Sequence, residues 1–192
     1  DNFANRVKIN GYSFTGFGTT VGAGSEAGEG FGGDKTVWWE WQSPISAPLT
    51  IRCDSGAFSA CIQVFTNDSI STLGLVASDI NDYFHNEVTF NAVAGTRYQI
   101  SVDGFHFGAG TESGKYRLSG QINGLESVKL NASASLDNSN LELHMEGLPG
   151  MKIALLSSTN LTTWTPLSTN TLTGSSLNLA VPIDSSSARF FR

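Results

Sequence analysis

The fold is decided by the stretch Lys35-Thr36-Val37-Trp38-Trp39-Glu40-Trp41-Gln42-Ser43-Pro44, which holds three of the four tryptophans in the chain. At the strand period of two, Val37, Trp39 and Trp41 share one face, and Trp38 lies on the other. So much aromatic surface on one face requires a core that neighbouring strands complete. The alternation therefore predicts a strand with Trp39 and Trp41 in the core, while Trp38 stays eligible for a role at the surface.

The composition of the 192-residue chain indicates all-β structure. It has 21 glycines, 40% hydrophobic residues and 15% charged residues, and glycine with abundant Ser, Thr and Asn disfavours long helices. The formal net charge is −6 and no cluster of Lys and Arg occurs, so neither nucleic acid nor an anionic membrane surface is an expected partner. No apolar run approaches the roughly 20 residues needed to span a bilayer.

Short alternating segments recur along the first two thirds of the chain, with turn signals between them. They are Val7–Phe17, Leu49–Cys53, Cys61–Thr66, Val88–Phe90, Tyr98–Val102 and Tyr116–Gly120. Strands at such regular spacing are typical of an antiparallel β-sandwich. The glycine-rich residues 16–33 cannot bury enough apolar surface to fold alone, so we expect a long loop that its neighbours hold in place.

The composition changes near Asn123-Gly124. Residues 1–123 contain 17 of the glycines and residues 124–192 contain four. The second part has strand patterns of its own, such as Leu141-Glu142-Leu143-His144-Met145-Glu146, which alternates as half-buried sheet does. We therefore predict two β domains, a jelly-roll-like antiparallel β-sandwich at 1–123 and a smaller Ig-like or fibronectin-like β-sandwich at 124–192. The second is small enough that we expect it to lean on the first or on a neighbour.

Several stretches follow one another in the order and spacing of a known family. They are Asp1-Asn2-Phe3-Ala4-Asn5, Val21-Gly22-Ala23 leading to Glu26-Ala27-Gly28-Glu29, and then Lys35–Trp41, Val76–Asp79, Val88–Tyr98 and Val102–Phe105. On these stretches, most of residues 1–120 resembles the pre-peptidase C-terminal β-sandwich module of secreted bacterial proteins. The resemblance implies a non-catalytic domain appended to hydrolases, proteases or adhesins, some relatives of which bind calcium or polymeric substrates.

The second part resembles a small β module that is common at the C-termini of secreted bacterial proteins. The resemblance rests on Leu148-Pro149-Gly150, Ser157–Leu161, Trp164–Leu167 and Arg189–Arg192. It implies no activity, and it leads us to expect that residue 192 lies close to a natural C-terminus.

The two cysteines, Cys53 and Cys61, lie at the end of one predicted strand and within the next. That position suits a disulfide across a hairpin, which would imply an oxidising, extracellular setting. Two buried free thiols are the alternative. We expect the chain to be secreted, in the extracellular space or at the cell surface.

The sequence carries no recognisable catalytic motif. The three histidines, His85, His106 and His144, lie in two predicted loops and on a polar strand face. None of them stands in a frame that activates a nucleophile or holds a catalytic zinc ion. We therefore expect surface histidines and no enzymatic activity.

Three carboxylates, Glu26, Glu29 and Asp34, lie in or beside the glycine-rich segment. Their oxygens, with backbone carbonyls that glycine lets turn inward, suit a hard cation, so they are the predicted ligands of a structural Ca²⁺ ion. The alternative is that Glu26 or Glu29 accepts backbone N–H groups and holds the loop.

Two predicted loops place aromatic rings where packing does not obviously demand them. Exposed rings beside polar groups suit stacking on the apolar faces of sugars. The predicted ligand-binding residues are Trp38, Tyr83, Phe84, His85, Phe105, His106 and Phe107. The alternative is that these side chains cap the ends of the sandwich or pack on the second domain.

These observations predict a non-catalytic extracellular accessory module that binds polysaccharide or another extracellular polymer. One alternative is a structural subunit of an extracellular or cell-surface assembly, an adhesin, filament or scaffold held by contacts with copies of itself or with an upstream catalytic domain. The other is an appendage for secretion or processing.

Overall fold

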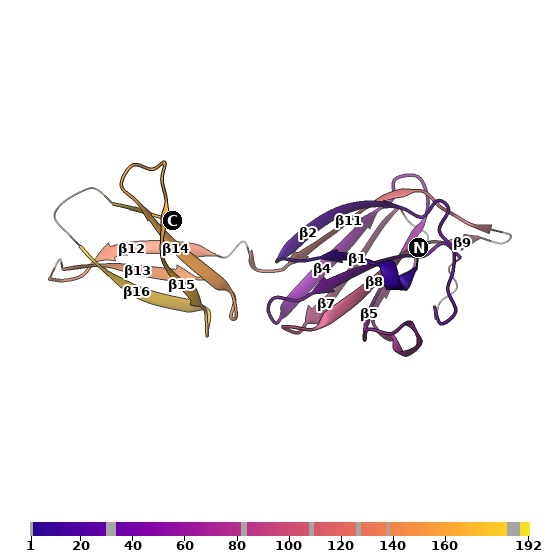
Figure 1. Ribbon diagram of the computed structural model, residues 1–192, viewed down its shortest axis with the longest axis horizontal. Coiled ribbons are helices and arrows are strands. Elements are labelled where there is room, and N and C mark those ends of the chain that lie inside the picture. Colours follow the sequence, from indigo (N-terminus) through magenta and orange to yellow (C-terminus); the bar gives the residue numbers. More distant parts are fainter. Residues whose placement is uncertain are drawn as a thin grey trace. The chain divides into compact units, whose positions relative to one another are not determined.

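The chain forms two compact units, Asp1–Asn123 and Gly124–Arg192, both built from β-sheets (Figure 1). The structure is a computed structural model that describes residues 2–29, 34–81, 84–107, 110–125, 128–137, 139–183 and 189–192. The predicted all-β fold is confirmed, with antiparallel sheets in each unit. Within these described ranges, no helix has the length and apolar character to cross a membrane.

The first unit contains two large sheets. The five-stranded sheet has the order β1 (Val7–Ile9), β3 (Val37–Gln42), β8 (Arg97–Gly104), β5 (Ala60–Thr66) and β6 (Gly74–Asp79). The four-stranded sheet has the order β2 (Ser13–Thr19), β11 (Lys115–Ile122), β4 (Ala47–Asp54) and β7 (His85–Ala92). Neighbouring strands are antiparallel, apart from the parallel pair β1–β3.

Four short elements complete the described part of the first unit. The strands β9 (His106–Phe107) and β10 (Gly110–Thr111) form a small ribbon, and two 3₁₀ turns, η1 (Phe3–Asn5) and η2 (Ile70–Thr72), precede β1 and β6. Both turns contribute side chains to the outer face of the five-stranded sheet.

The tryptophan strand β3 faces the core as its alternation predicts. The side chains of Val37, Trp39 and Trp41 are 7%, 5% and 0% exposed. Trp39 crosses the sandwich and its Nε1–H donates to the Tyr116 hydroxyl on β11, 2.9 Å away. A Cβ atom at Gly16 of β2 would lie 2.5 Å from the Trp39 ring, so only glycine fits beneath this indole. The Trp39 side chain on β3 therefore restricts position 16 of the opposite sheet to glycine.

Trp38 points away from that core and is nevertheless buried, at 2% exposed. Its ring meets Phe3 edge-on at 5.0 Å and Phe65 at 5.8 Å, with Ile70 and Leu73 packed around them. These five residues form a second hydrophobic cluster, which we call the outer cluster. The prediction that Trp38 is available at the surface is wrong, because η1, η2 and the glycine-rich loop cover this part of the sheet.

The outer face of β8 is buried as well, although it is polar. Gln99, Ser101 and Asp103 alternate with the core residues Tyr98, Ile100 and Val102, and all six are buried. Buried polar groups require hydrogen-bond partners. The outer face of this sheet is therefore where polar side chains are held in fixed positions.

The connections of the first unit gather at two ends of the sandwich. The pairs Asp54–His85 and Ala60–Gly104 place the β4–β5, β6–β7 and β8–β9 connections at one end, which we call the loop end. The β3–β4, β5–β6 and β7–β8 connections lie at the opposite end, where Asn123 N–H donates to Pro48 O as the chain leaves the unit. We call this the linker end.

The predicted disulfide is absent, and Cys53 and Cys61 are separate thiols. The disulfide was predicted on the assumption that the two cysteines lie on the strands of one hairpin. The consecutive strands β4 and β5 do not pair, however, and belong to different sheets. Cys53 faces the core, whereas Cys61 alternates with the fully buried Ala60 and Ile62 and so faces away from it. Burial, followed by the charges of Asp54 and Cys61, raises the pKa of the Cys53 thiol to about 12.

The second unit is a smaller sandwich of two three-stranded sheets (Figure 1). One sheet contains β12 (Lys129–Ala134), β13 (Asn140–Glu146) and β16 (Ser176–Pro182), and the other contains β15 (Thr165–Thr171), β14 (Lys152–Ser158) and β17 (Phe190–Phe191). Its buried hydrophobic residues are Leu143, Met145, Met151, Leu155 and Leu172.

Candidate ligand-binding groove

A groove of about 700 Å³ opens on the outer face of the five-stranded sheet, at the linker end. Its volume lies within the roughly 300–1,000 Å³ that is usual for small-molecule sites. Three segments form its walls: the end of β3, the β5–β6 connection and the β7–β8 turn. The lining residues are polar or glycine: Gln42, Thr66, Asn67, Asp68, Thr72, Gly95, Thr96 and Arg97.

The β5–β6 connection forms one wall and holds its own shape. Asn67 has a φ of 75°, in the left-handed region that Asn tolerates better than most residues. Its Nδ2 donates to the Thr72 carbonyl at 2.6 Å, and Thr72 N–H donates to Ser69 O at 3.0 Å. These bonds close the loop on itself and place Asp68 at its edge.

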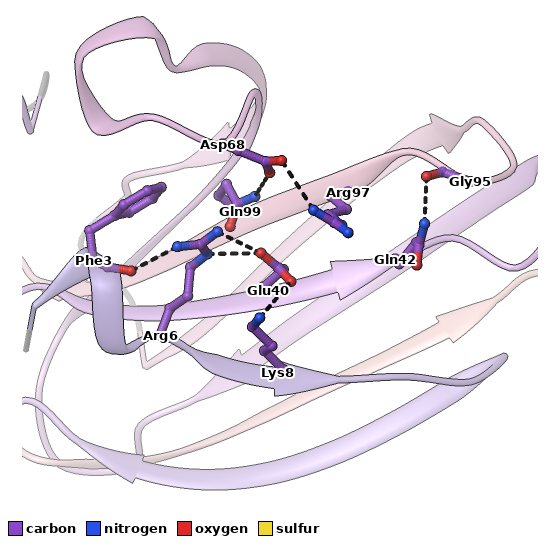
Figure 2. Close-up of polar contacts among 9 residues, drawn as sticks. All are labelled: Phe3, Arg6, Lys8, Glu40, Gln42, Asp68, Gly95, Arg97 and Gln99. Atoms are coloured by element: carbon purple, nitrogen blue, oxygen red, sulfur yellow. Dashed lines mark hydrogen bonds and ion pairs between the residues drawn. The ribbon is translucent and has the colours of Figure 1, made fainter.

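The β7–β8 turn forms the facing wall and is attached to the end of β3. Gly95, at a φ of 79°, donates its N–H to Ser43 O at 2.8 Å, and Ser43 N–H donates to Thr96 O at 3.0 Å. The Gln42 amide Nε2 donates to the Gly95 carbonyl at 2.8 Å (Figure 2). The turn and the strand end are therefore one bonded unit.

Asp68 and Arg97 bring opposite charges together in the groove. Asp68 Oδ2 lies 3.3 Å from Arg97 Nη1, and its Oδ1 accepts a hydrogen bond from Gln99 Nε2 at 3.0 Å (Figure 2). The two charged side chains are each 53% exposed, whereas Gln99 is 0% exposed. The carboxylate is thus held from beneath by a buried amide and remains open to a ligand.

Gln99 itself is not fully satisfied. Its Oε1 atom is buried and has no hydrogen-bond partner within the part of the chain that the structure describes. A buried amide oxygen without a partner is costly and uncommon in a folded protein. The unpartnered oxygen belongs to the same side-chain amide whose Nε2 holds Asp68.

A buried ion pair lies beside Gln99 on the same face. Arg6 directs Nε and Nη2 to Glu40 Oε2 at 3.0 and 2.7 Å, and its Nη1 donates to the Phe3 carbonyl at 3.0 Å (Figure 2). Lys8 Nζ is 4.0 Å from Glu40 Oε1. Arg6 and Glu40 are mostly buried, so this pair ties η1 and β1 to β3 rather than meeting a ligand.

Phe84 and Phe105, two of the predicted aromatic residues, lie at the loop end, away from this groove. Phe84 is 50% exposed and its carbonyl accepts Ser55 N–H, while the half-buried Phe105 donates its N–H to Ser59 O. The backbones of both residues therefore flank the β4–β5 connection. The exposed His85 and His106 follow them in sequence: His85 Nδ1 is 2.8 Å from Asp54 Oδ1, and His106 Nδ1 is 3.0 Å from Thr111 Oγ1. Tyr83 and the side chain of Phe107 lie outside the described residues.

The three predicted calcium ligands have separate partners. Glu26 accepts the N–H of Phe3, and Glu29 accepts the Trp38 Nε1–H at 2.9 Å and the Thr36 hydroxyl at 3.2 Å. Asp34 Oδ2 accepts the Thr111 hydroxyl at 3.3 Å and lies 3.9 Å from His106 Nδ1. In the described ranges, no three His, Cys, Asp or Glu residues gather as a metal site would require. Glu26 and Glu29 hold the loop, and calcium binding stays a prediction.

The sequence did not predict the groove residues, because they come from three separate segments spread over positions 42–97. One signal was present: Arg97, Gln99, Ser101 and Asp103 alternate with hydrophobic residues along β8. An alternating strand normally turns its polar side chains to bulk water. The burial of Gln99, Ser101 and Asp103 depends on segments that fold over this face, which the alternation does not reveal.

Comparison with known proteins gave no matching family model and no matching curated protein. Among solved structures, the chain is similar to the pre-peptidase C-terminal domain of a collagenase from Bacillus anthracis, at 19% identity over 61% of this chain and 95% of that one, with a TM-score of 0.43. It is also similar to PliG, a periplasmic inhibitor of g-type lysozyme from Aeromonas hydrophila (14% identity, 61% and 96%, TM-score 0.40). A GH2 β-galacturonidase from Eisenbergiella tayi is a third (13% identity, 80% and 30%, TM-score 0.32). These similarities concern the fold alone.

Proposed function

We propose that this chain is a non-catalytic extracellular accessory module that binds polysaccharide through the groove on the outer face of its five-stranded sheet. The observation that carries the proposal is the half-exposed Asp68–Arg97 pair, fixed from beneath by the buried amide of Gln99. Sugar hydroxyls both donate and accept hydrogen bonds, and carboxylate, guanidinium and amide groups together supply both halves of that pattern.

The groove is built before a ligand arrives. The Asn67 side chain closes the β5–β6 connection on itself, and hydrogen bonds from Gln42 and Gly95 join the β7–β8 turn to the end of β3. A site whose side chains are already ordered loses less conformational entropy on binding, so polar contacts alone give a useful affinity. A lining without aromatic rings predicts modest affinity per sugar unit.

The groove replaces the loop aromatics as the proposed contact surface. Trp38 is buried within the outer cluster, and Phe105 is half-buried, with its backbone N–H bonded to Ser59 O. Among the described tryptophan and phenylalanine candidates, Phe84 alone presents half of its side chain to solvent. A single exposed ring is a common surface feature, whereas a concave site with fixed polar groups is not.

The test is retention on insoluble polysaccharides and in affinity gels with Asp68→Ala and Arg97→Ala. Loss of a hydrogen bond to a charged group costs about 1.5–3 kcal/mol, so each variant is expected to bind roughly 10- to 100-fold more weakly. Arg52→Ala is the matched control, because Arg52 pairs with Glu87 on β4 and β7 and is similarly exposed. Unchanged binding by both groove variants, or binding lost in Phe84→Ala instead, overturns the proposal.

A second candidate function, self-assembly, rests on the exposed edges of the two sheets. Phe17 on edge strand β2 is 78% exposed, and Leu75 and Val76 on edge strand β6 are also exposed. Edge strands with apolar side chains can pair with another chain. Light scattering over a range of concentrations tests this, since a constant monomer mass removes the candidate.

A further inference from the structure

We infer that the groove selects neutral sugars with hydroxyls on neighbouring carbons and rejects uronic acids. The inference rests on the proposed function and concerns the charge that the ligand carries. The observation behind it is that the groove is charge-balanced: Asp68 and Arg97 are its two charged lining residues, and they are already paired with each other.

The pairing removes the usual means of binding an acidic sugar. A uronate carboxylate needs a cationic partner, most often an arginine that can offer two parallel N–H groups. Arg97 directs Nη1 to Asp68, 3.3 Å away, so a second carboxylate at the guanidinium would also approach that of Asp68. Like charges placed together reject the wrong ligand at an interface.

The same pair suits two adjacent hydroxyls. A carboxylate oxygen accepts from one hydroxyl while the neighbouring guanidinium donates to the next, and each hydroxyl can play either part. Asp68 and Arg97 present acceptor and donor side by side, both half-exposed. The uncharged amides of Gln42 and Asn67 add further polar groups to the same lining.

Gln99 keeps this arrangement from relaxing. Its Nε2 holds Asp68 Oδ1 at 3.0 Å, and it has no freedom to move because it is fully buried between neighbouring strands of the sheet. The carboxylate therefore keeps its position beside Arg97 whether or not a sugar is present. Selection against acidic ligands is built into the free groove.

The experiment compares polymers matched in sugar stereochemistry but not in charge. Galactan is paired with polygalacturonate and mannan with polymannuronate, and binding is measured by affinity electrophoresis and calorimetry at one salt concentration. The wild-type chain is expected to bind the neutral member of a pair at least about tenfold more tightly.

The decisive variant is Asp68→Asn. Asparagine keeps Oδ1 as an acceptor for Gln99, but it frees the charge of Arg97, so binding of the polyuronates is expected to rise at least about tenfold. Glu87→Gln is the matched control, because it frees Arg52 on the other sheet and should leave the preference unchanged. Melting curves verify that both variants are folded.

The outcomes separate the two claims. If the wild-type chain binds polyuronates as tightly as their neutral partners, or if Asp68→Asn gains no affinity for them, the inference is overturned while the proposed function stands. If the wild-type chain binds no polysaccharide of either kind, the proposed function fails and the inference fails with it.

Discussion

Replacing Trp38 by alanine should destabilise the first unit strongly, although Trp38 lies on the face of β3 that looks away from the main core. The structure buries its side chain to 2% exposure and packs it against Phe3 and Phe65. Its Nε1–H also donates to Glu29 at 2.9 Å, which attaches the glycine-rich loop to the sheet. A residue with these contacts is part of the structure rather than a platform for a ligand.

The magnitude follows from the buried area. A buried tryptophan removes about 150–250 Å² from water, which at about 25 cal/mol per Å² corresponds to roughly 4–6 kcal/mol. Alanine keeps a small part of that, and the usual cost of Trp→Ala in a core is about 3–5 kcal/mol. We therefore expect the free energy of unfolding to fall by about 4 kcal/mol, out of the roughly 5–15 kcal/mol typical of a domain.

Urea denaturation followed by tryptophan fluorescence measures this change. In a Trp164→Phe background the remaining tryptophans all lie in the first unit, so the signal reports that unit alone. Trp38→Phe keeps most of the packing and loses the bond to Glu29, so it should cost about 1.5–3 kcal/mol. Phe84→Ala, at a half-exposed ring, serves as the control and should cost less than about 1 kcal/mol. If Trp38→Ala lowers the free energy of unfolding by less than about 1 kcal/mol, Trp38 is not buried in the outer cluster and the reasoning is refuted.

Three further predictions follow from the buried groups. Glu40→Gln should destabilise the first unit by about 3 kcal/mol in urea titrations, because it leaves the buried Arg6 cation without its partner. Glu87→Gln breaks the exposed pair with Arg52 and is the control. A loss of stability in Glu40→Gln no larger than that in Glu87→Gln would show that the Arg6–Glu40 pair is not buried. A thiol reagent should modify Cys61 in the native chain and Cys53 only after unfolding, because Cys53 is fully buried with a raised pKa. Detection of no thiol in the unfolded, unreduced chain would contradict the absence of a disulfide. Burial raises the pKa of Asp103 above 3.8, so its contribution to stability is complete below that pH and is lost as the pH rises through the raised value. The stability of the wild type relative to Asp103→Asn should therefore fall across that interval, and a pH-independent difference would refute the shift.

The sequence predicts the strand pattern well where one face of a strand meets one core. On β3, Val37, Trp39 and Trp41 point inward as their alternation requires. The same rule does not predict the burial of Trp38. A period of two shows which residues share a face of the strand, but it does not show whether other segments cover the second face. Phe3 and Ile70, which cover it, come from short 3₁₀ turns with no periodic signal of their own.

The candidate site could not be read from the sequence for a related reason. Gln42, Asp68 and Arg97 are ordinary surface residues in their own segments, and only strand pairing brings β3, β5 and β8 together. The cysteine pair illustrates the opposite error. Nearness in sequence suggested a hairpin between Cys53 and Cys61, but β4 and β5 cross from one sheet to the other.

The most direct test of the proposed groove is to map the ligand on the chain by NMR. A neutral oligosaccharide is titrated into ¹⁵N-labelled protein, and the shifts of the backbone amides are followed. The largest changes are expected at Asn67, Asp68, Gly95 and Arg97, which line the groove. Changes that instead gather around Phe84 and the loop end, with the groove amides unmoved, would contradict the proposed site.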